Sequence, residues 1–289
     1  MAGICSGVDA GFVTLGYGKV AFLGLVQGLT ELLPVSSTAH MRVVPALLGW
    51  SDPGAAFSAA MQSAALVAVV SYFWRDLIGI TGGAVRAAAH RRFTDPNLRM
   101  VGLIALATIP IVIGGLLLAP LLNACNSPLR SLTAIGVSCV VMAGLLAWAE
   151  LAARHRRKME GADLKDAILV GLAQVGALIP GVSRSGSTLT AALGLGFERE
   201  EAARFSFMLG IPAIALAGAK EVWELHKIHL PGHGWAVLGV GLVFGALSSV
   251  VAIWTLMRVL ERFSAWPFVF YRALLGVVLL LGVAGGFLH

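Results

Sequence analysis

Residues 18–50 have the sequence GKVAFLGLVQGLTELLPVSSTAHMRVVPALLGW, which is apolar enough for a membrane interior but cannot form one unbroken helix. Pro34 interrupts it near the middle, and polar or ionisable side chains surround that proline; these are Glu31, Ser36, Ser37, Thr38, His40 and Arg42. Non-helical backbone at membrane depth is tolerated only where protein buries it or where it lines a cavity. We therefore expect a re-entrant hairpin, in which one helix ends at the proline and a second helix returns to the same side.

A second stretch repeats this pattern. Residues 164–197 read LKDAILVGLAQVGALIPGVSRSGSTLTAALGLGF, and Pro180 interrupts them shortly before Arg184. The spacing is also shared, because Gln27 lies nine positions before Ser36 and Gln174 lies nine positions before Ser183. We predict that this stretch is a second re-entrant hairpin.

Long uncharged segments follow each hairpin and predict transmembrane spans of roughly 20 residues. They lie at 55–74, 100–120 and 131–149 after the first hairpin, and at 203–219, 235–257 and 267–288 after the second. The last span carries Arg272 near its start, where we expect the interface to accommodate it. Three crossings are an odd number, so the second copy would lie upside down relative to the first, as in other inverted-repeat membrane proteins.

The composition excludes a soluble globular protein. Of the 289 residues, 58% are hydrophobic and 12% are charged, and the mean hydropathy is +0.86, whereas soluble domains carry about 25% charged residues. We predict an all-α polytopic membrane protein with six transmembrane helices and two re-entrant helical hairpins. Residues 1–150 and 151–289 would be the two inverted-topology repeats of one integral membrane domain.

The basic residues predict the orientation in the membrane. Segments 75–99 and 150–165 are rich in arginine, and further basic residues would lie on the same side; these are Arg199, Arg204, Arg258 and Arg262. The opposite side would carry only Lys19, Arg130, Lys220 and Lys227. Because cytoplasmic loops carry the excess of basic residues, we expect both termini outside and a pocket reached from the external face. This explains the net charge of +6 without a nucleic-acid partner.

Side chains suited to phosphoryl chemistry gather at both proline turns. Gln27 and Glu31 share a helix face, as do Ser37 and His40, because their spacings are i,i+4 and i,i+3. The helix that begins after each turn would present free N–H groups and a positive dipole end to an anion. Arg184 would clamp phosphate oxygens, together with the hydroxyl residues and glycine near the turns; these are Ser36, Thr38, Gly181, Ser183, Ser185 and Thr188.

Other interpretations of these residues stay open. Glu31 and Arg184 would also satisfy each other as a buried ion pair, and the hydroxyl residues at 36–38 would serve as helix caps alone. Glu31, together with Gln27, would otherwise hold a divalent cation. A glycine-rich segment favours either close helix packing within the chain or a homodimer; it contains Gly239, Gly241 and Gly245.

Two segments resemble the signatures of the undecaprenyl-diphosphatase family of bacterial bacitracin-resistance phosphatases. QGLTELLPVSSTAH (27–40) is similar to an (E/Q)xxxE box followed by PVSST-x-H, and PGVSRSGST (180–188) is similar to PGxSRSxxT. FEREEAARFSFMLGIPAI (197–214) resembles the continuation of the second signature, and the resemblance covers nearly the whole chain in order. Many members carry Glu where this chain has Gln27, so a single carboxylate would weaken metal binding or change proton transfer.

The resemblance implies hydrolysis of undecaprenyl diphosphate to undecaprenyl phosphate and inorganic phosphate, which recycles the lipid carrier of cell-wall synthesis and confers bacitracin resistance. It implies a multi-pass protein of the bacterial plasma (inner) membrane, with an active site open to the external, periplasmic face. It also implies a divalent cation, Mg²⁺ or Ca²⁺, and a polyprenyl diphosphate lipid as partner within the bilayer. The implied catalytic residues are Glu31, Ser37, His40 and Arg184.

The mechanism and one competing function stay open. In one mechanism Ser37 attacks the terminal phosphorus with His40 as base, but attack by His40 itself or by water fits the sequence as well. Inverted repeats with broken helices also occur in transporters. The alternative function is therefore a polyprenyl-phosphate flippase, with or without hydrolysis.

Overall fold

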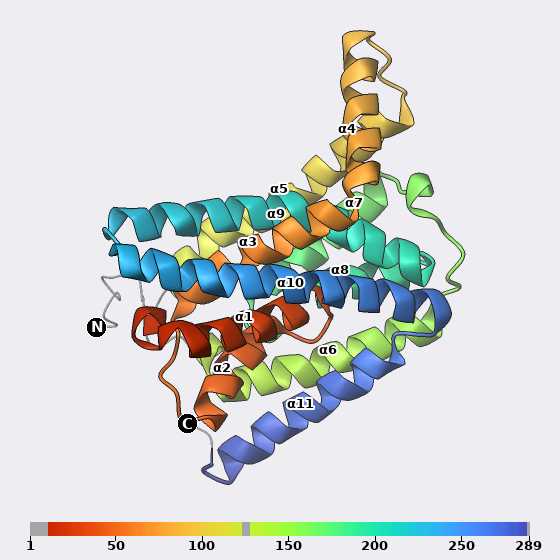
Figure 1. The fold of residues 1–289 in the computed structure, drawn as a ribbon. Helices are drawn as coiled ribbons and strands as arrows, with labels where there is room; N and C mark the ends of the chain where they lie inside the picture. The colour runs from red at the N-terminus through yellow and green to blue at the C-terminus, as the bar shows by residue number, and fades with distance from the viewer. Residues whose placement is uncertain (1–10, 123–127, 288–289) are drawn as a thin grey trace.

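The computed structural model describes residues 11–122 and 128–287, and these ranges consist of helices joined by short connections (Figure 1). The long helices are α1 (Gly16–Leu32), α2 (Ser37–Leu47), α3 (Ala55–Tyr72), α4 (Trp74–Ala89), α5 (Pro96–Leu122), α6 (Leu132–Ala152), α7 (Leu164–Val175), α8 (Arg184–Gly194), α9 (Arg199–Lys227), α10 (Gly232–Arg262) and α11 (Trp266–Ala284). A short 3₁₀ turn, η4 (Gly176–Leu178), follows α7. The predicted all-α class is confirmed.

The predicted spans coincide with helices. Five helices are long and apolar enough to cross a membrane, and α3 passes the same criterion only together with α4, from which it is bent by 79°. The five are α5, α6, α9, α10 and α11. Two of them, α9 and α10, contain 29 and 31 residues and extend beyond the predicted spans 203–219 and 235–257. Charged residues end an apolar segment without ending the helix, because their long side chains can reach the interface.

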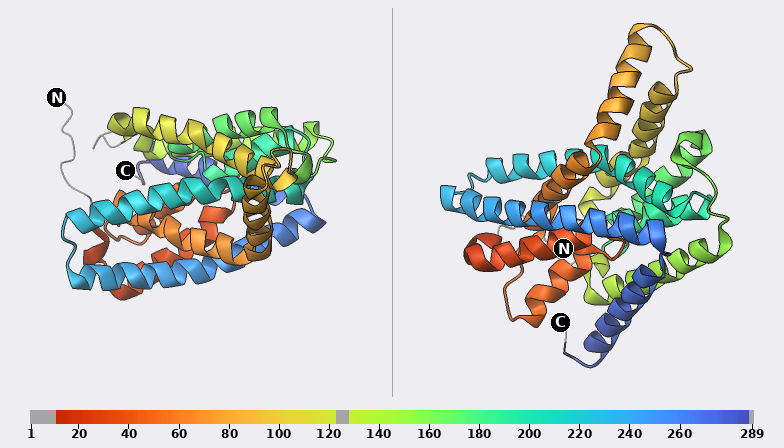
Figure 2. Two further views of the ribbon diagram at one scale, coloured as in Figure 1. Left: turned by 90° about the horizontal axis from the view of Figure 1, so that it is seen from above. Right: turned by 45° about the vertical axis from the view of Figure 1, so that its right-hand side comes forward.

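Most long helices lie alongside one another, but α4 does not. In Figure 1, α3 lies between α9 and α10 and α1 packs against α10, while α6 packs against α11 below them. α4 projects from this body, as Figure 2 also shows. Residues 75–99 were expected to form a basic loop, yet most of them belong to α4 and the start of α5. Their charges lower the hydropathy, although the apolar residues of α4 still follow a helical spacing.

The helix connections fall at two opposite ends of the molecule. The α9–α10 connection and the first turn of α1 lie toward the left in Figure 1, whereas the α6–α7, α8–α9 and α10–α11 connections lie toward the right. Segment 150–165 forms the α6–α7 connection and the adjoining helix ends. Arg199 begins α9, and Arg258 and Arg262 lie in the last turns of α10, so these basic residues adjoin the connections at the right-hand end. The prediction that most basic residues lie on one side of the membrane requires that the basic connections lie at one end of the molecule.

Glycines let α1 and α10 approach closely. A Cβ on Gly24 would lie 2.5 Å from the carbonyl oxygen of Gly241, and one on Gly28 would lie 2.1 Å from that of Gly245. Ser249 of α10 also donates its hydroxyl to the Gly28 carbonyl at 3.2 Å. Small residues four apart typically bring membrane helices together. Of the two sequence interpretations, close packing within the chain accounts for Gly241 and Gly245, and the homodimer stays a prediction.

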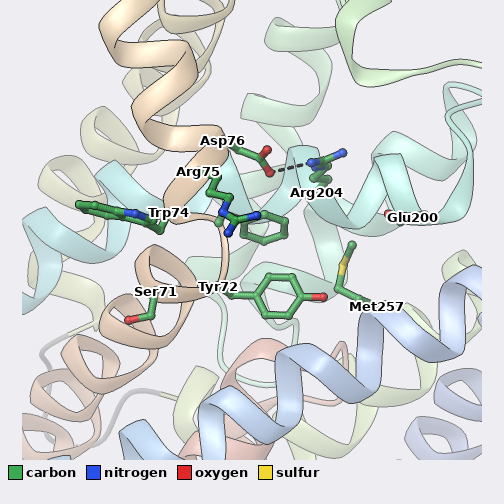
Figure 3. Close-up of a pocket in the computed structure, with 9 residues that line it drawn as sticks. Ser71, Tyr72, Trp74, Arg75, Asp76, Glu200, Arg204 and Met257 are labelled. Carbon is green, nitrogen blue, oxygen red and sulfur yellow. Dashed lines mark hydrogen bonds and ion pairs between the residues drawn. The ribbon is translucent and has the colours of Figure 1, made fainter.

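Charged side chains hold the bend between α3 and α4. Arg204 of α9 donates to the Asp76 carboxylate at 2.6 Å, and its guanidinium lies 5.9 Å from the centre of the Phe73 ring. These groups and Arg75 border a cleft of about 490 Å³ (Figure 3). None of the predicted site residues lines this cleft, so it is separate from the candidate site described below.

Both interrupted stretches form helical hairpins whose two ends lie together. In the first, the Lys19 ammonium at the start of α1 lies 5.4 Å from the centre of the Trp50 ring, beyond the end of α2. In the second, Arg157 donates to Asp166 in α7 at 2.9 Å and to the Leu195 carbonyl just after α8 at 3.0 Å. Each chain segment therefore runs out and back. Insertion of the two hairpins from opposite membrane faces, as inverted repeats, stays a prediction.

Candidate active site

The two proline turns meet through polar groups. Ser185 in the first turn of α8 donates its hydroxyl to the Leu33 carbonyl at 3.0 Å and lies 3.3 Å from the Glu31 carbonyl oxygen. Arg184 Nη2 lies 3.5 Å from Glu31 Oε1. The fold thus brings the predicted acid and the predicted guanidinium together from opposite halves of the chain.

Arg272 of α11 binds both turns at once. Its guanidinium donates to the carbonyls of Pro34 at 3.0 Å and Gly181 at 2.6 Å, and also to that of Val182. The side chain is only 1% exposed, so it is held within the protein, and its depth relative to the membrane interface stays a prediction. An ionisable residue inside an apolar span usually faces the protein interior and has a dedicated partner. That signal was present in the sequence, but the position of Arg272 near the start of the span favoured the interface.

Two serines share an unusual backbone conformation at the turns. Ser36 has a φ of 72° and Ser183 a φ of 69°, in a region that residues other than glycine rarely adopt. Each caps the helix that follows, because its hydroxyl accepts the N–H of Ala39 at 3.4 Å or of Gly186 at 3.2 Å. The correspondence between these two serines, first seen in their spacing, therefore extends to their backbone. Strained residues of this kind cluster at functional sites.

Glu31 is the centre of the hydrogen-bond network. Its Oε2 accepts a hydrogen bond from Gln27 Nε2 at 2.9 Å and another from Ser37 Oγ at 2.6 Å. Glu31 is buried and Ser37 is half-buried, so the hydroxyl is reachable while the carboxylate is shielded. A carboxylate that accepts a hydrogen bond from a hydroxyl is placed to take its proton. The sequence paired Ser37 with His40, whereas the hydrogen bond in the structure goes to Glu31.

His40 has a different partner, Tyr271 of α11. His40 Nδ1 lies 2.7 Å from the Ser36 carbonyl oxygen, and because a carbonyl can only accept, Nδ1 carries the proton. In the neutral ring Nε2 then accepts from the Tyr271 hydroxyl at 2.6 Å. The two rings are stacked, with centroids 5.7 Å apart. Nothing in the sequence marked Tyr271, because an aromatic residue near a span end is typical of a membrane interface.

Two glycines make room for the guanidinium groups. A Cβ on Gly210 of α9 would lie 1.9 Å from Arg184 Nη1, and one on Gly186 would lie 2.4 Å from Arg272 Nη1. Among the described residues, Glu31 is the single acceptor near Arg184, and Arg184 Nε is buried without a partner. Unused guanidinium donors are suited to a phosphate. Gly210 was not predicted as a site residue.

The remaining predicted phosphate-binding residues divide into two groups. Thr188 is fully buried, and its hydroxyl donates to the Arg184 carbonyl at 2.8 Å and lies 2.5 Å from Ser206 Oγ. Gly181 has a φ of 92°, and a Cβ there would lie 2.7 Å from the Ile135 carbonyl oxygen. These residues, like Ser185 and Ser36, are engaged by the protein itself. The accessible ones are Thr38, which is exposed, and Ser183, which is partly exposed.

Oxygen ligands for a cation lie beside Glu31. No three His, Cys, Asp or Glu side chains converge within residues 11–122 and 128–287. Gln27 Oε1, however, is buried and has no hydrogen-bond partner there, and its own Nε2 contacts the Glu31 carboxylate. Mg²⁺ is usually held by one or two carboxylates together with substrate phosphates. The donor set of Gln27, Glu31 and Ser37 therefore fits a cation whose coordination a phosphate completes.

The chain is similar along nearly its whole length to known proteins. The family described as "Bacitracin resistance protein BacA" matches residues 20–278. "Undecaprenyl-diphosphatase 2" of Mesorhizobium japonicum is 69% identical over 263 residues, which cover 91% of this chain and 100% of the relative. "Undecaprenyl-diphosphatase" of Gloeobacter violaceus is 48% identical over 274 residues, covering 95% and 94%. The protein of the same name from Trichodesmium erythraeum is 45% identical over 269 residues, covering 93% and 86%.

Proposed function

Because the chain belongs to the bacitracin resistance protein family, we propose that it hydrolyses undecaprenyl diphosphate to undecaprenyl phosphate and inorganic phosphate. It is a membrane phosphatase that acts on a phosphoric anhydride, and it recycles a lipid carrier and supports bacitracin resistance. The observation that carries the assignment in this chain is the 2.6 Å hydrogen bond from Ser37 to Glu31, beside the Arg184 guanidinium. It combines a hydroxyl, a base and an anion clamp in one place.

In the proposed first step, Ser37 Oγ attacks the terminal phosphorus while its proton moves to Glu31. The bond from that phosphorus to the bridging oxygen breaks, and undecaprenyl phosphate leaves with the electron pair. Arg184 and the N–H groups at the start of α2 and α8 stabilise the charge on the equatorial oxygens. These residues need only position the reacting groups and stabilise the negative charge, because catalysis of phosphoryl transfer depends mainly on these two effects.

In the second step, water attacks the phosphoserine, and Glu31 returns its proton to Ser37 Oγ. The proton lost by water passes to the Tyr271 oxygen as the Tyr271 hydroxyl proton moves to His40 Nε2. When inorganic phosphate leaves, the same relay runs in reverse and gives one proton to the phosphate, which restores neutral His40. The supporting observation is the tautomer of His40. Because Nδ1 carries the proton and donates to the Ser36 carbonyl, Nε2 is unprotonated and can receive a proton from Tyr271. His40 then acts one helical turn from Ser37, on the same face of α2.

The cofactor in this proposal is a divalent cation, Mg²⁺ or Ca²⁺, held by Gln27 and Glu31 together with the diphosphate. When bound, it would neutralise charge on the phosphate oxygens. The buried, unpaired Gln27 Oε1 supports this assignment. The presence of Gln27 in place of a second carboxylate lowers the negative charge available to the ion, so we expect weaker cation binding than in relatives with Glu at this position.

A phosphate-release assay tests both the function and the cofactor. Purified protein in detergent should release inorganic phosphate from undecaprenyl diphosphate, and a chelator should lower the rate at least about tenfold. Added Mg²⁺ or Ca²⁺ should restore it, whereas a monovalent salt at equal ionic strength should not. Absence of phosphate release with either ion would overturn the proposed hydrolysis and would be the result expected of a pure flippase. Full activity in chelator would remove the cation from the proposal.

Replacing Tyr271 with phenylalanine should slow dephosphorylation more than phosphorylation. The variant keeps the stacked ring but loses the hydroxyl that donates to His40 at 2.6 Å. We expect kcat to fall about tenfold, a size typical of weakened acid–base catalysis, and phosphoenzyme to accumulate after an acid quench. Tyr72→Phe, in the separate cleft at the α3–α4 bend, is the matched control. A fall in kcat without phosphoenzyme accumulation would contradict the relay.

The proposed location is the bacterial inner membrane, with the site open to the external face and both termini outside. The grouping of the basic connections at one end of the molecule supports this orientation (Figure 1). The terminal residues 1–10 and 288–289 themselves lie outside the described residues. The inverted repeat of 1–150 and 151–289 belongs to the same proposal, and the matching φ angles of Ser36 and Ser183 support it.

A further inference from the structure

An apolar groove of about 470 Å³ lies between α6, α7 and α8. Gly176 and Val182 line it near the second proline turn, and Trp148 and Gly194 line it near the end of α8. Trp148 is 62% exposed, so the groove is open on the outer surface of the helices. In a protein of this class that surface faces hydrocarbon.

Among the described residues, the groove lining is almost entirely apolar, and its side-chain donors are the Trp148 indole N–H and two hydroxyls. The hydroxyls among the described lining residues belong to Ser187 and Thr190. Ser187 donates to the Arg184 carbonyl at 3.1 Å, and Thr190 donates to the Gly186 carbonyl at 2.6 Å. Both hydroxyls are therefore occupied within α8, and within the described ranges no charged residue lines the groove. Such a lining suits a hydrocarbon occupant.

The groove and the candidate active site adjoin the same proline turn, the second one. Val182 lines the groove and its carbonyl accepts a hydrogen bond from Arg272. The next two residues are the strained cap Ser183 and the anion-binding Arg184. Arg184 therefore lies two residues along the chain from a residue that lines the apolar groove.

The direction of the groove suits a lipid whose head points outward. From the turn, it follows α8 toward the Gly194 end, which adjoins the basic α8–α9 connection. The α8 helix has 11 residues, so at 1.5 Å per residue the groove follows it for about 16 Å. In the proposed orientation, the groove therefore runs from the turn away from the external opening of the site. A lipid of the outer leaflet has its head toward the outside and its tail directed this way.

We propose that this groove binds the first part of the polyprenyl chain of the substrate while the diphosphate occupies the adjoining site. The proposal rests on the proposed function, because the substrate is taken from it. The groove would thus distinguish long polyprenyl diphosphates from short ones. An ordinary phospholipid chain in the same groove would give no such distinction, and the experiment below separates the two cases.

Gly194 offers a way to fill the groove without disturbing the fold. A Cβ at Gly194 would lie 3.5 Å from Trp148 Cζ3, which is ordinary van der Waals contact. A longer side chain there would extend into the groove. Gly144 of α6 provides the matched control, because it is exposed, does not line the groove and has no atom within 4 Å of an added Cβ.

The experiment compares undecaprenyl diphosphate with geranyl diphosphate, whose short tail would end before Gly194. For Gly194→Leu we expect the KM for undecaprenyl diphosphate to rise about tenfold with kcat retained, as for loss of uniform binding in an apolar pocket. The values for geranyl diphosphate should stay at those of the wild type. Gly144→Leu should match the wild type with both substrates.

A second pair of variants keeps the test independent of any folding defect in Gly194→Leu. Trp148→Ala removes one wall of the groove, and Leu151→Ala truncates a side chain of α6 that is 73% exposed and lies outside it. The first should raise the KM for the long substrate alone, and the second should change neither substrate. Equal effects on long and short substrates, or equal effects of a variant and its control, would overturn the groove assignment while leaving the phosphatase activity intact. Failure of the wild type to hydrolyse either substrate would instead refute the proposed function, and the groove assignment with it.

Discussion

Replacing Ser37 with alanine is expected to lower kcat for undecaprenyl diphosphate by at least about a thousandfold, because the change removes the proposed nucleophile. Ser37 Oγ is the one hydroxyl that donates to the buried Glu31 carboxylate among the described residues, at 2.6 Å. KM should change little, since Arg184 and the helix N-termini still bind the diphosphate. Phosphate release at saturating substrate measures the loss.

Ser71→Ala is the matched control for this prediction. Ser71 of α3 borders the separate cleft at the α3–α4 bend, and its hydroxyl donates to the Val67 carbonyl at 2.7 Å, so most of the turnover should remain. Acid quenching with substrate labelled in the terminal phosphate should place the label on Ser37 in the wild type. Label on His40, or turnover by Ser37→Ala within about tenfold of the wild type, would show that another group attacks the phosphorus.

Replacing Arg272 with methionine should lower the free energy of unfolding by about 3 kcal/mol or more and abolish turnover. The change leaves the buried carbonyls of Pro34 and Val182 without their donor, and that of Gly181 with only the weak contact from the Cys139 thiol. Each buried polar group that loses its partner costs about 1–3 kcal/mol. Turnover should be lost as well, because the two turns that carry Ser37 and Arg184 would no longer share an anchor. Thermal unfolding in detergent and phosphate release measure the two effects.

Two further variants separate the anchor from the charge. Arg272→Lys keeps the positive charge, but a single ammonium lacks the planar fork that reaches both turns, so we expect a folded protein with low turnover. Arg258→Met removes an arginine whose side chain is 47% exposed and pairs with Glu261 at 3.1 Å, and surface pairs of this kind contribute little. Wild-type stability and turnover in Arg272→Met would mean that these carbonyl contacts do not position the turns.

Local features of the fold were predictable because they depend on neighbouring residues. Proline cannot continue a helix, so the breaks at Pro34 and Pro180 were expected, and serine is a favoured helix cap, so the starts of α2 and α8 were expected too. Apolar length predicted the spans. The helix α4 was missed, since its arginines and Asp76 lower the hydropathy by which spans are recognised.

Which side chains meet was beyond the sequence. His40 contacts Tyr271, 231 positions away, and the Pro34 carbonyl contacts Arg272, 238 positions away. Periodicity and motifs describe one helix at a time, whereas these contacts depend on how α11 packs against both turns. The partner of Ser37 illustrates the difference even within one motif. Helical spacing favoured His40, but the turn at Pro34 folds the end of α1 back over the start of α2, and the hydroxyl meets Glu31 instead.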